Sequence, residues 1–485
     1  MSDTPRFRWF RQDQCRLCGR CLQACPVLEL PEQAAVAEKK RLLSSSPEAS
    51  LALRYCVTCN ICDRVCPQNA APYELVLECF DRRANDRGLP YIAKMVLPDE
   101  PENIWSALRP LMSRRERDLL AAWDKALEEK HEQLILTGFY TNLVPFLADL
   151  GVIRDLGLPI AGSEGLWGCG GDTNKMGLIG QTEAVVTLID RVFQKMAPAR
   201  VYCFMEAEAA MLTEILPRYY GACFDFEALP LDDLILSRLR SGDIGISKPL
   251  GLTVTVHDNC MSRYLNGRPQ AVVREILAKT GCHIREMAHN REKALCCGWA
   301  ATIPTLYTGS GNPFATMAYL LYSLNRRLTE AERTGAEALV TGCPACFLFL
   351  TLIKVLTNAR IEVFHLLEIV DMAQGGQPVR KAEERCWEIL AQSSTLMLNW
   401  TLAKKNRRRF FPRPIEAGSP RPPAPASLRD AVKTARFERL YKSRLTQNAL
   451  VRAMLAAAVR LTARLYQSWL DRQKSSRRLP LRPMS

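Results

Sequence analysis

Two short cysteine runs near the N-terminus restrict the fold of this chain more than any other feature. The runs are Cys15-x2-Cys18-x2-Cys21-x3-Cys25-Pro26 and Cys56-x2-Cys59-x2-Cys62-x3-Cys66-Pro67. Three thiolates two residues apart on one loop can reach three iron atoms of a cube. Structural zinc sites use paired C-x2-C units instead of triplets with a trailing Cys-Pro. The spacing therefore predicts two [4Fe–4S] clusters.

This pattern is the run found in bacterial ferredoxins, in which the fourth cysteine of each run ligates the other cluster. The predicted ligands are Cys15, Cys18, Cys21 and Cys66 for cluster 1, and Cys56, Cys59, Cys62 and Cys25 for cluster 2. Thirty residues separate Cys25 from Cys56, and they include the helix-like stretch 30–43. Because compact ferredoxins have a shorter connection, we expect a mostly helical ferredoxin domain over residues 1–95.

A third group of cysteines lies far downstream. Its candidate ligands are Cys260, Cys296, Cys297, Cys343 and Cys346. Adjacent cysteines beside a C-x2-C pair do not easily hold one ordinary cube, so five thiolates around one site indicate an unusual cluster. Zinc, with four ligands, would leave one thiol spare. A redox-active dithiol is the remaining interpretation.

The residues around these five cysteines resemble the cysteine-rich CCG domain family. Asp258-Asn259-Cys260, Cys296-Cys297-Gly298 and Cys343-Pro344-Ala345-Cys346 match its D-x-C, CCG and C-P-x-C motifs. The family includes the catalytic subunit of heterodisulfide reductases and iron–sulfur subunits of glycolate oxidase, anaerobic glycerol-3-phosphate dehydrogenase and lactate-utilisation complexes. The resemblance spans residues 10–370. It implies a third, CCG-type cluster, and it makes Cys297 and Cys296 the candidate catalytic residues.

The CCG pattern usually occurs twice in this family, and the first copy here has lost most of its ligands. Segments 134–140 and 166–172 are similar to 252–260 and 295–298. Only Cys169 and Cys203 remain, and two thiolates cannot hold a five-ligand cluster. A mixed site with Glu206 is one interpretation, and thiols lining the cleft between the repeats are the preferred one.

Short apolar runs suited to strands precede the ligand loops. They cover 133–137, 201–204, 252–256, 338–341 and 361–364, and helical stretches at 181–193, 271–279 and 313–328 follow. Alternating strands and helices predict parallel sheets, whose ligand loops lie at the carboxyl ends of the strands.

Three residues beside Cys260 are expected to tune a cluster through hydrogen bonds or charge, namely His257, Asp258 and Arg263. His257 either carries a proton or, in the preferred interpretation, bonds to a loop carbonyl. Trp299 either shields the cluster or packs in the core. No GxGxxG motif follows a predicted strand, so no flavin or nucleotide is expected on this chain.

The positive charge is concentrated in the last 85 residues. Residues 401–485 carry 21 Lys and Arg against 4 Asp and Glu, while the other 400 residues carry 44 against 47. A helix without a break is expected from 427 to 472, with Leu450, Met454, Leu461, Leu465 and Trp469 at helical spacing. Such a helix suits an anionic membrane surface or an acidic groove on a partner. Aromatic residues are sparse and no base-reading motif is present, which disfavours nucleic acid.

The predicted fold class is α+β multidomain. The expected domains are a helical ferredoxin domain (1–95), a helical linker (96–130), a degenerate first CCG repeat (131–245), an intact second CCG repeat (246–375), a helical extension (376–410), a Pro-rich linker (411–426) and a basic amphipathic helical tail (427–485).

The predicted function is that of an iron–sulfur electron-transfer subunit of an anaerobic redox complex, which passes electrons through two cubes to a CCG-bound cluster. A catalytic disulfide or heterodisulfide reductase subunit is the alternative, and a nucleic-acid or scaffold protein with structural clusters is the third. Membrane-bound or flavoprotein redox subunits are the expected partners. No apolar run approaches 18 residues and the N-terminus lacks an apolar segment. The expected location is the cytoplasm, with peripheral contact to the inner face of the cytoplasmic membrane.

Overall fold

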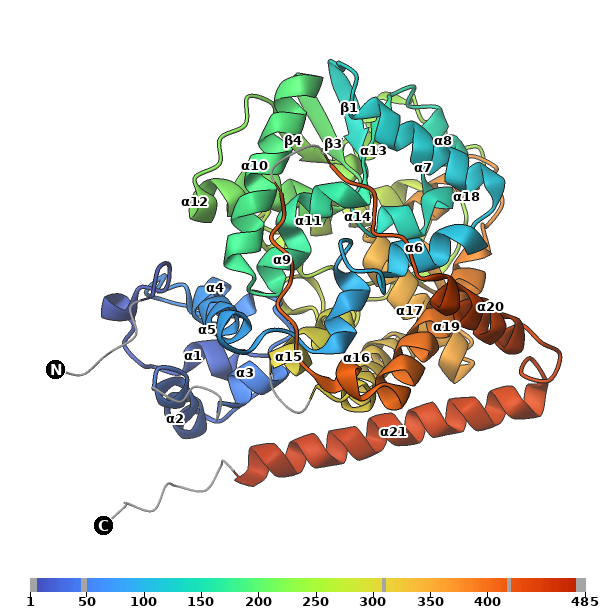
Figure 1. Ribbon diagram of the computed structural model, residues 1–485. Helices are drawn as coiled ribbons and strands as arrows, with labels where there is room; N and C mark the ends of the chain where they lie inside the picture. Colours follow the sequence, from blue (N-terminus) through green and yellow to red (C-terminus); the bar gives the residue numbers. More distant parts are fainter. Residues whose placement is uncertain (1–6, 45–49, 308–310, 417–419, 477–485) are drawn as a thin grey trace, which may run out of the picture.

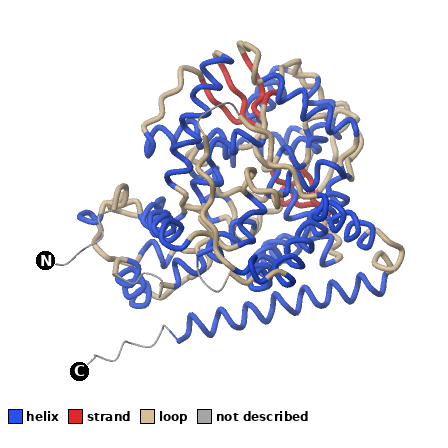
Figure 2. Tube along the Cα trace, viewed as in Figure 1, coloured by secondary structure: helices blue, strands red, loops and turns tan. Residues whose placement is uncertain are grey.

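The computed structural model describes residues 7–44, 50–307, 311–416 and 420–476. Its strands are β1 (Gln133–Leu136), β2 (Ile160–Ala161), β3 (Arg200–Cys203), β4 (Glu227–Pro230), β5 (Thr253–Val256), β6 (His283–Ile284), β7 (Ala338–Thr341) and β8 (Glu362–His365). They form two parallel sheets with strand orders β2-β1-β3-β4 and β6-β5-β7-β8. Helices surround both sheets, so the chain combines helical and α/β parts (Figure 2).

Five strands lie where the apolar runs predict them, namely β1, β3, β5, β7 and β8. The other three were not predicted. β2 and β6 are two residues long, too short for an apolar pattern, and they form only as edge partners of β1 and β5 through pairs such as Ile135–Ile160 and Thr253–His283. β4 ends at Pro230 and pairs with β3 alone. Tertiary pairing, not local sequence, decides these edges.

The N-terminal part is helical, as the long spacing between the cysteine runs predicts. Its helices are α1 (Arg20–Gln23), α2 (Glu32–Leu42), α3 (Leu51–Tyr55), α4 (Ile61–Arg64) and α5 (Pro72–Arg87), followed by α6 (Ile104–Leu108) and α7 (Arg114–Ala126). α2 lies inside the stretch 30–43. α1 and α4 each begin two residues after the second cysteine of a run and carry its third cysteine.

The helices around the two sheets are α8 (Gly151–Arg154), α9 (Gly171–Lys175), α10 (Ile179–Met196), α11 (Glu206–Ala210), α12 (Leu216–Tyr220), α13 (Leu231–Ser241), α14 (Arg268–Lys279), α15 (Thr302–Tyr307), α16 (Pro313–Glu332), α17 (Pro344–Thr357) and α18 (Leu366–Ala373). α17 is buried along its whole length. It is apolar on all sides, which is typical of a helix in the centre of a domain.

Three helices form the C-terminal part: α19 (Lys381–Leu402), α20 (Leu428–Tyr441) and α21 (Ala449–Ser476). The expectation of one unbroken helix after Ser427 is wrong. Thr446 donates its hydroxyl to the carbonyls of Leu440 and Tyr441 and so caps the end of α20, while the Asn448 side chain accepts from the Leu450 amide and starts α21. α21 then runs along the edge of the molecule against α16 and α17 (Figure 1).

A buried arginine joins the N-terminal helices to the second α/β half. Arg263 is fully buried, and its guanidinium donates to the carbonyls of Cys59 at 2.7 Å, Glu292 at 3.0 Å and Ala294 at 2.5 Å. Cys59 belongs to the second cysteine run, and Ala294 precedes the CCG motif by two residues. The arginine therefore holds the two cysteine-bearing loops together.

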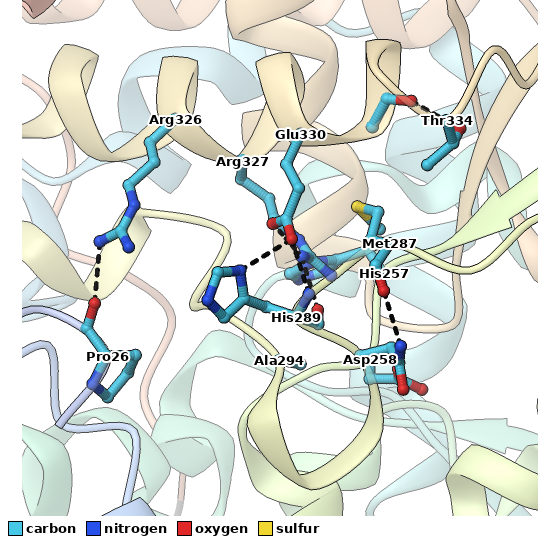
Figure 3. Close-up of polar contacts among 12 residues, drawn as sticks. Pro26, His257, Asp258, Met287, His289, Ala294, Arg326, Arg327, Glu330 and Thr334 are labelled. Atoms are coloured by element: carbon cyan, nitrogen blue, oxygen red, sulfur yellow. Dashed lines mark hydrogen bonds and ion pairs between the residues drawn. The ribbon is translucent and has the colours of Figure 1, made fainter. Parts of the chain in front are cut away.

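Helix α16 makes a second connection between the same parts. The Tyr319 hydroxyl donates to the carbonyl of Tyr55 at 2.8 Å. Arg326 donates to the carbonyl of Pro26 at 2.8 Å (Figure 3). Tyr55 directly precedes Cys56, and Pro26 directly follows Cys25, so α16 orients both ends of one predicted ligand set.

We expect Arg263→Met to destabilise the protein by about 3–5 kcal/mol, because three buried carbonyls would lose their donor. A fall of several degrees in the thermal midpoint of the anaerobically purified protein would measure this loss. Arg64→Met is the matched control. Arg64 lies at the same junction, but its side chain is 42% exposed and approaches Glu292 only to 3.9 Å, so it should cost less than about 1 kcal/mol. Equal effects of the two substitutions would contradict the role of Arg263.

Candidate iron–sulfur sites

The two N-terminal cysteine loops adopt the same backbone turn. Leu17 and Gly19 have φ values of 55° and 70°, and the corresponding residues Thr58 and Asn60 have φ values of 45° and 64°. Alternating left-handed residues turn successive amides toward one side, which makes a concave site for an anion. The Thr58 amide donates to the sulfur of Cys56 at 3.4 Å. Both loops therefore suit a negatively charged cluster.

The first group gathers Cys15, Cys18, Cys21 and Cys66 around one cavity of about 360 Å³. Lys39 of α2 lines the same cavity. Its side chain is 1% exposed, and its Nζ has no hydrogen-bond partner among the described residues. Burying an unpaired ammonium is costly, and a cluster held by four thiolates would supply the missing negative charge. The residues fit the predicted cluster 1, and its ligation stays a prediction.

The second group consists of Cys25, Cys56, Cys59 and Cys62. Burial, together with the neighbouring Cys59 thiol, raises the pKa of Cys25 to about 12. Burial likewise raises the pKa of Cys56 and of Cys62, with the nearby cysteines adding to both shifts. Thiols crowded in this way ionise only around a cation, and metal binding supplies that condition. These residues fit predicted cluster 2 on the same terms.

The third group lies at the carboxyl ends of the strands in the second sheet. Cys260 follows β5, Cys296 and Cys297 lie in the loop after β6, and Cys343 precedes α17, whose first turn carries Cys346. All five line one cavity. They come together because parallel strands end at the same edge of a sheet.

Hydrogen bonds between the thiols of this group lower the pKa of some cysteines and raise that of others. Cys296 and Cys346 donate to Cys297 and hold its pKa below the usual range, and Cys346 does the same for Cys343. The pKa of Cys260 is raised by its hydrogen bond with Cys296 and by burial. None of the 19 cysteines, all within the described residues, forms a disulfide.

Lys175 reaches the third group from the other α/β half. It ends α9, and its Nζ donates to the sulfur of Cys260 at 3.0 Å. Although burial opposes the charge, the Cys260 thiolate raises the pKa of Lys175. The first half therefore contributes a cation to the cysteines of the second half. The signal in the sequence was present, because Lys175 follows the glycine-rich segment that parallels the CCG motif.

His257 faces the same cysteines and is oriented by an arginine. Arg327 is fully buried, is anchored by Glu330 at 2.7 Å, and donates to Nδ1 of His257 at 2.9 Å (Figure 3). The ring proton is therefore on Nε2, which has no hydrogen-bond partner among the described residues. The ligand atoms of His257, Cys297 and Cys346 lie within 4.8 Å of one another. With Nδ1 accepting from Arg327 and the proton on Nε2, the ring has no free lone pair for a metal, so His257 is placed as a hydrogen-bond donor toward these two cysteines.

Two properties of His257 differ from the expectation. Its partner is a guanidinium, so the predicted bond to a loop carbonyl is wrong. Burial, with Arg327 beside it, lowers the pKa of His257 well below its usual value. The ring stays neutral at physiological pH, which suits a hydrogen-bond donor better than a proton carrier.

Asp258 and Trp299 hold the surroundings of the third group in place. Asp258 is paired with Arg274 at 2.7 and 2.9 Å. Trp299 lines the cysteine cavity and stacks on Phe349 with ring centroids 4.2 Å apart. Trp299 therefore fills both roles proposed from the sequence, as a wall of the site and as a core residue.

Cys169 and Cys203 do not reach the cysteine cavity. Both are 1% exposed and lie in the core around the first sheet, so the expectation that they line the cleft between the halves is wrong. Burial and the nearby Glu208 raise the pKa of both thiols. Glu206 instead faces Asp232 and Asn259. A mixed site of Cys169, Cys203 and Glu206 is not found among the described residues.

The second and third groups are neighbours. Cys296 contributes to the raised pKa of Cys56, which places these two thiols within electrostatic range of each other. Arg263 spans the same interval through its bonds to Cys59 and Ala294. Cys21 of the first group likewise contributes to the raised pKa of Cys62 in the second, so neighbouring groups lie within electrostatic range of each other.

Comparison with known proteins agrees with this geometry. Residues 254–351 match the family model described as the cysteine-rich domain CCG. The chain carries a CCG domain. The match contains all five cysteines of the third group, His257 and Arg327.

A second comparison matches a smaller part of the chain to a ferredoxin-like protein. Over 138 residues, the chain is 26% identical to a protein named "Probable membrane-anchored ferredoxin" from Chromohalobacter salexigens. The alignment covers 27% of this chain and about a fifth, 19%, of that protein. Within the described residues, no helix has the length and apolar character needed to cross a bilayer.

Lys39 was missed in the sequence because lysines in a helix are usually exposed. We expect Lys39→Met to lower the reduction potential of one [4Fe–4S] cluster by about 40–80 mV, since removing about 1–2 kcal/mol of charge stabilisation favours the oxidised form. Redox titration followed by electron paramagnetic resonance measures the shift. Lys40→Met changes the next residue of α2, which is exposed, and should leave the potential unchanged. A shift in the control alone would contradict this role of Lys39.

Proposed function

We propose that this chain is an iron–sulfur electron-transfer subunit. In this proposal two [4Fe–4S] clusters occupy the N-terminal cysteine groups, and a CCG-type cluster occupies Cys260, Cys296, Cys297, Cys343 and Cys346. The CCG domain and the ferredoxin-like relative support the iron–sulfur role. The chain's own part is to hold the thiolates, shield them from water and set their electrostatic surroundings.

The observation that carries the proposal is the junction at Arg263. A buried arginine bonds directly to a loop of the second cysteine group and to the loop of the third. Such a connection keeps the separation between redox centres constant, which electron transfer requires. Structural clusters without a redox role would not need a constant distance between their loops.

The number of clusters is tested by iron and acid-labile sulfide analysis of the anaerobically purified chain. We expect about twelve irons per chain, four for each of three clusters. About eight would leave the CCG cysteines without iron and would remove the last step of the proposed path. A zinc-containing protein with no labile sulfide would overturn the proposal.

A catalytic disulfide or heterodisulfide reductase is the second candidate. Cys260 and Cys296 are half-buried and line a cavity, so a substrate sulfur could approach them. In that case Cys297→Ala abolishes disulfide turnover, while a reduced dye still reduces the two N-terminal clusters. Retained turnover would exclude catalysis at this site. Cys282→Ala is the control, because Cys282 is a buried cysteine that does not line the cavity.

We also propose that helix α21 docks on an anionic membrane surface. Its inner side buries Ala456, Val459 and Ala463, whereas its outer side exposes an apolar stripe. The stripe consists of Leu450, Met454, Leu461 and Leu465, which are 56–69% exposed and spaced by four, seven and four residues. Arg460 and Arg464 lie beside it and are exposed. An outward apolar stripe flanked by arginines is typical of helices that lie in the membrane interface.

Replacing Leu461 and Leu465 together with serine should weaken binding to vesicles with about a quarter anionic lipid at least tenfold. Cosedimentation of the full chain with the vesicles measures the affinity. The control replaces Leu428 and Leu445, which are 81% and 70% exposed but outside the stripe. Unchanged binding of the stripe variant would indicate a protein partner, such as a membrane-bound or flavoprotein redox subunit, in place of lipid.

The two α/β halves are proposed to be copies of one unit, with the boundaries given in the sequence analysis. Both sheets share one strand order, in which β1 corresponds to β5 and β3 to β7. In this proposal the first copy, which has lost its own ligands, keeps a role through Lys175. The copy supports the cluster of the second copy with a cation.

A further inference from the structure

An apolar cavity lies directly beside the third cysteine group. It is enclosed mainly by α15, α16, α17 and α19. Its walls are mostly aliphatic and aromatic, with Leu320, Phe349 and Ile389 among them. Pockets with an apolar lining and a few polar groups are typical of sites for small organic ligands.

The ionisable groups of this cavity lie together at one end. Of the lining residues, two are ionisable, Tyr140 and Asp172. The Tyr140 hydroxyl donates to Asp172 at 2.5 Å and accepts from Nε1 of Trp299 at 2.6 Å. These three residues also line the cavity that contains the five cysteines. The polar end is therefore the wall shared with the proposed cluster.

We propose that this cavity binds a lipid-soluble quinone, with its ring at Tyr140 and Asp172 and its tail between α16, α17 and α19. The inference rests on the proposed electron-transfer function and names its exchange partner. The shape of the site requires a ligand with a long apolar part and one small polar end. A quinone fits, because its carbonyl can accept the Tyr140 hydroxyl in place of Asp172, and the hydroxyl of its reduced form can donate to Asp172.

The charge at the polar end excludes the commonest alternative ligand. A fatty acid also has one polar end, but its carboxylate would lie against the carboxyl group of Asp172 without a cation among the lining residues. Two carboxylates in an apolar site repel each other. A neutral head group avoids this repulsion, as a quinone does.

Residues at the surface side of the cavity suit a ligand that arrives from lipid. Met317 of α16 and Met397 of α19 line the cavity and are half-exposed. On the same helices, Phe314 is 51% and Leu402 72% exposed. α21, the helix proposed to contact the membrane, packs against α16 and α17 (Figure 1). Access to the cavity and membrane contact thus involve neighbouring helices.

The test is equilibrium binding of decylubiquinone to the full-length, anaerobically purified protein, with decanol as a probe for the tail alone. We expect decylubiquinone to bind at least tenfold more tightly than decanol. Met317→Trp should fill the cavity and weaken decylubiquinone binding at least tenfold. Ala315→Trp, an exposed residue of α16 outside the lining, should change it less than twofold.

Tyr140→Phe should remove most of the preference for decylubiquinone over decanol while leaving decanol binding unchanged. This comparison needs no cavity-filling variant, so it stands even where Met317→Trp does not fold. Equal affinity for the two probes, or equal effects of the two tryptophan substitutions, would overturn the inference. Iron content and dithionite reduction of the clusters, measured on the same samples, test the proposed function separately. Filled, reducible clusters without quinone binding would overturn this inference alone.

Discussion

The contact on which the rest of the arrangement depends is the buried guanidinium of Arg263. It donates three hydrogen bonds across the junction between the N-terminal helices and the second α/β half. Since backbone carbonyls buried without a donor cost free energy, the two loops are stable only together. The arginine lies three residues after Cys260, so a residue at the edge of one cysteine group also fixes the position of another. The N-terminal helices and the second α/β half therefore pack against each other around this arginine.

Cations are placed at the cysteine groups in a consistent way. Lys39 faces the first group over the Phe10 ring and has no hydrogen-bond acceptor among the described residues, and Lys175 is bonded to Cys260. Arg327 acts on the cysteines indirectly. It donates to His257 and, together with burial, keeps the pKa of that ring low and the ring neutral. Burial raises the pKa of most of these thiols, so thiolates form there only with positive charge nearby. The side chains around the cysteines thus favour an anionic centre, and they come from segments far apart in the sequence.

The apolar cavity and the outer stripe of α21 extend this picture toward a membrane. Tyr140, Asp172 and Trp299 separate the cavity from the cysteines, and α16 connects cavity, cysteine loops and α21. The same helix carries Tyr319 and Arg326, which bind the segments next to Cys56 and Cys25. An electron-transfer path from the N-terminal groups to a ligand in the cavity would therefore follow one rigid element.

The cysteine spacing alone determined most of the candidate ligands, because ligands close in sequence are constrained by the geometry of a cluster. The apolar runs likewise predicted five strands, and the long spacing between the two cysteine runs predicted the helical character of the N-terminal part. The strands β2, β4 and β6 were beyond prediction, since pairing with a neighbour creates them and β2 and β6 are only two residues long. So was the break after α20, where side-chain caps compete with the helix. Only the tertiary structure decided that Lys39, Lys175 and Arg327 face the cysteines, and that Cys169 and Cys203 do not. The charge of a residue follows from its type, but its partner depends on which segments the fold buries together.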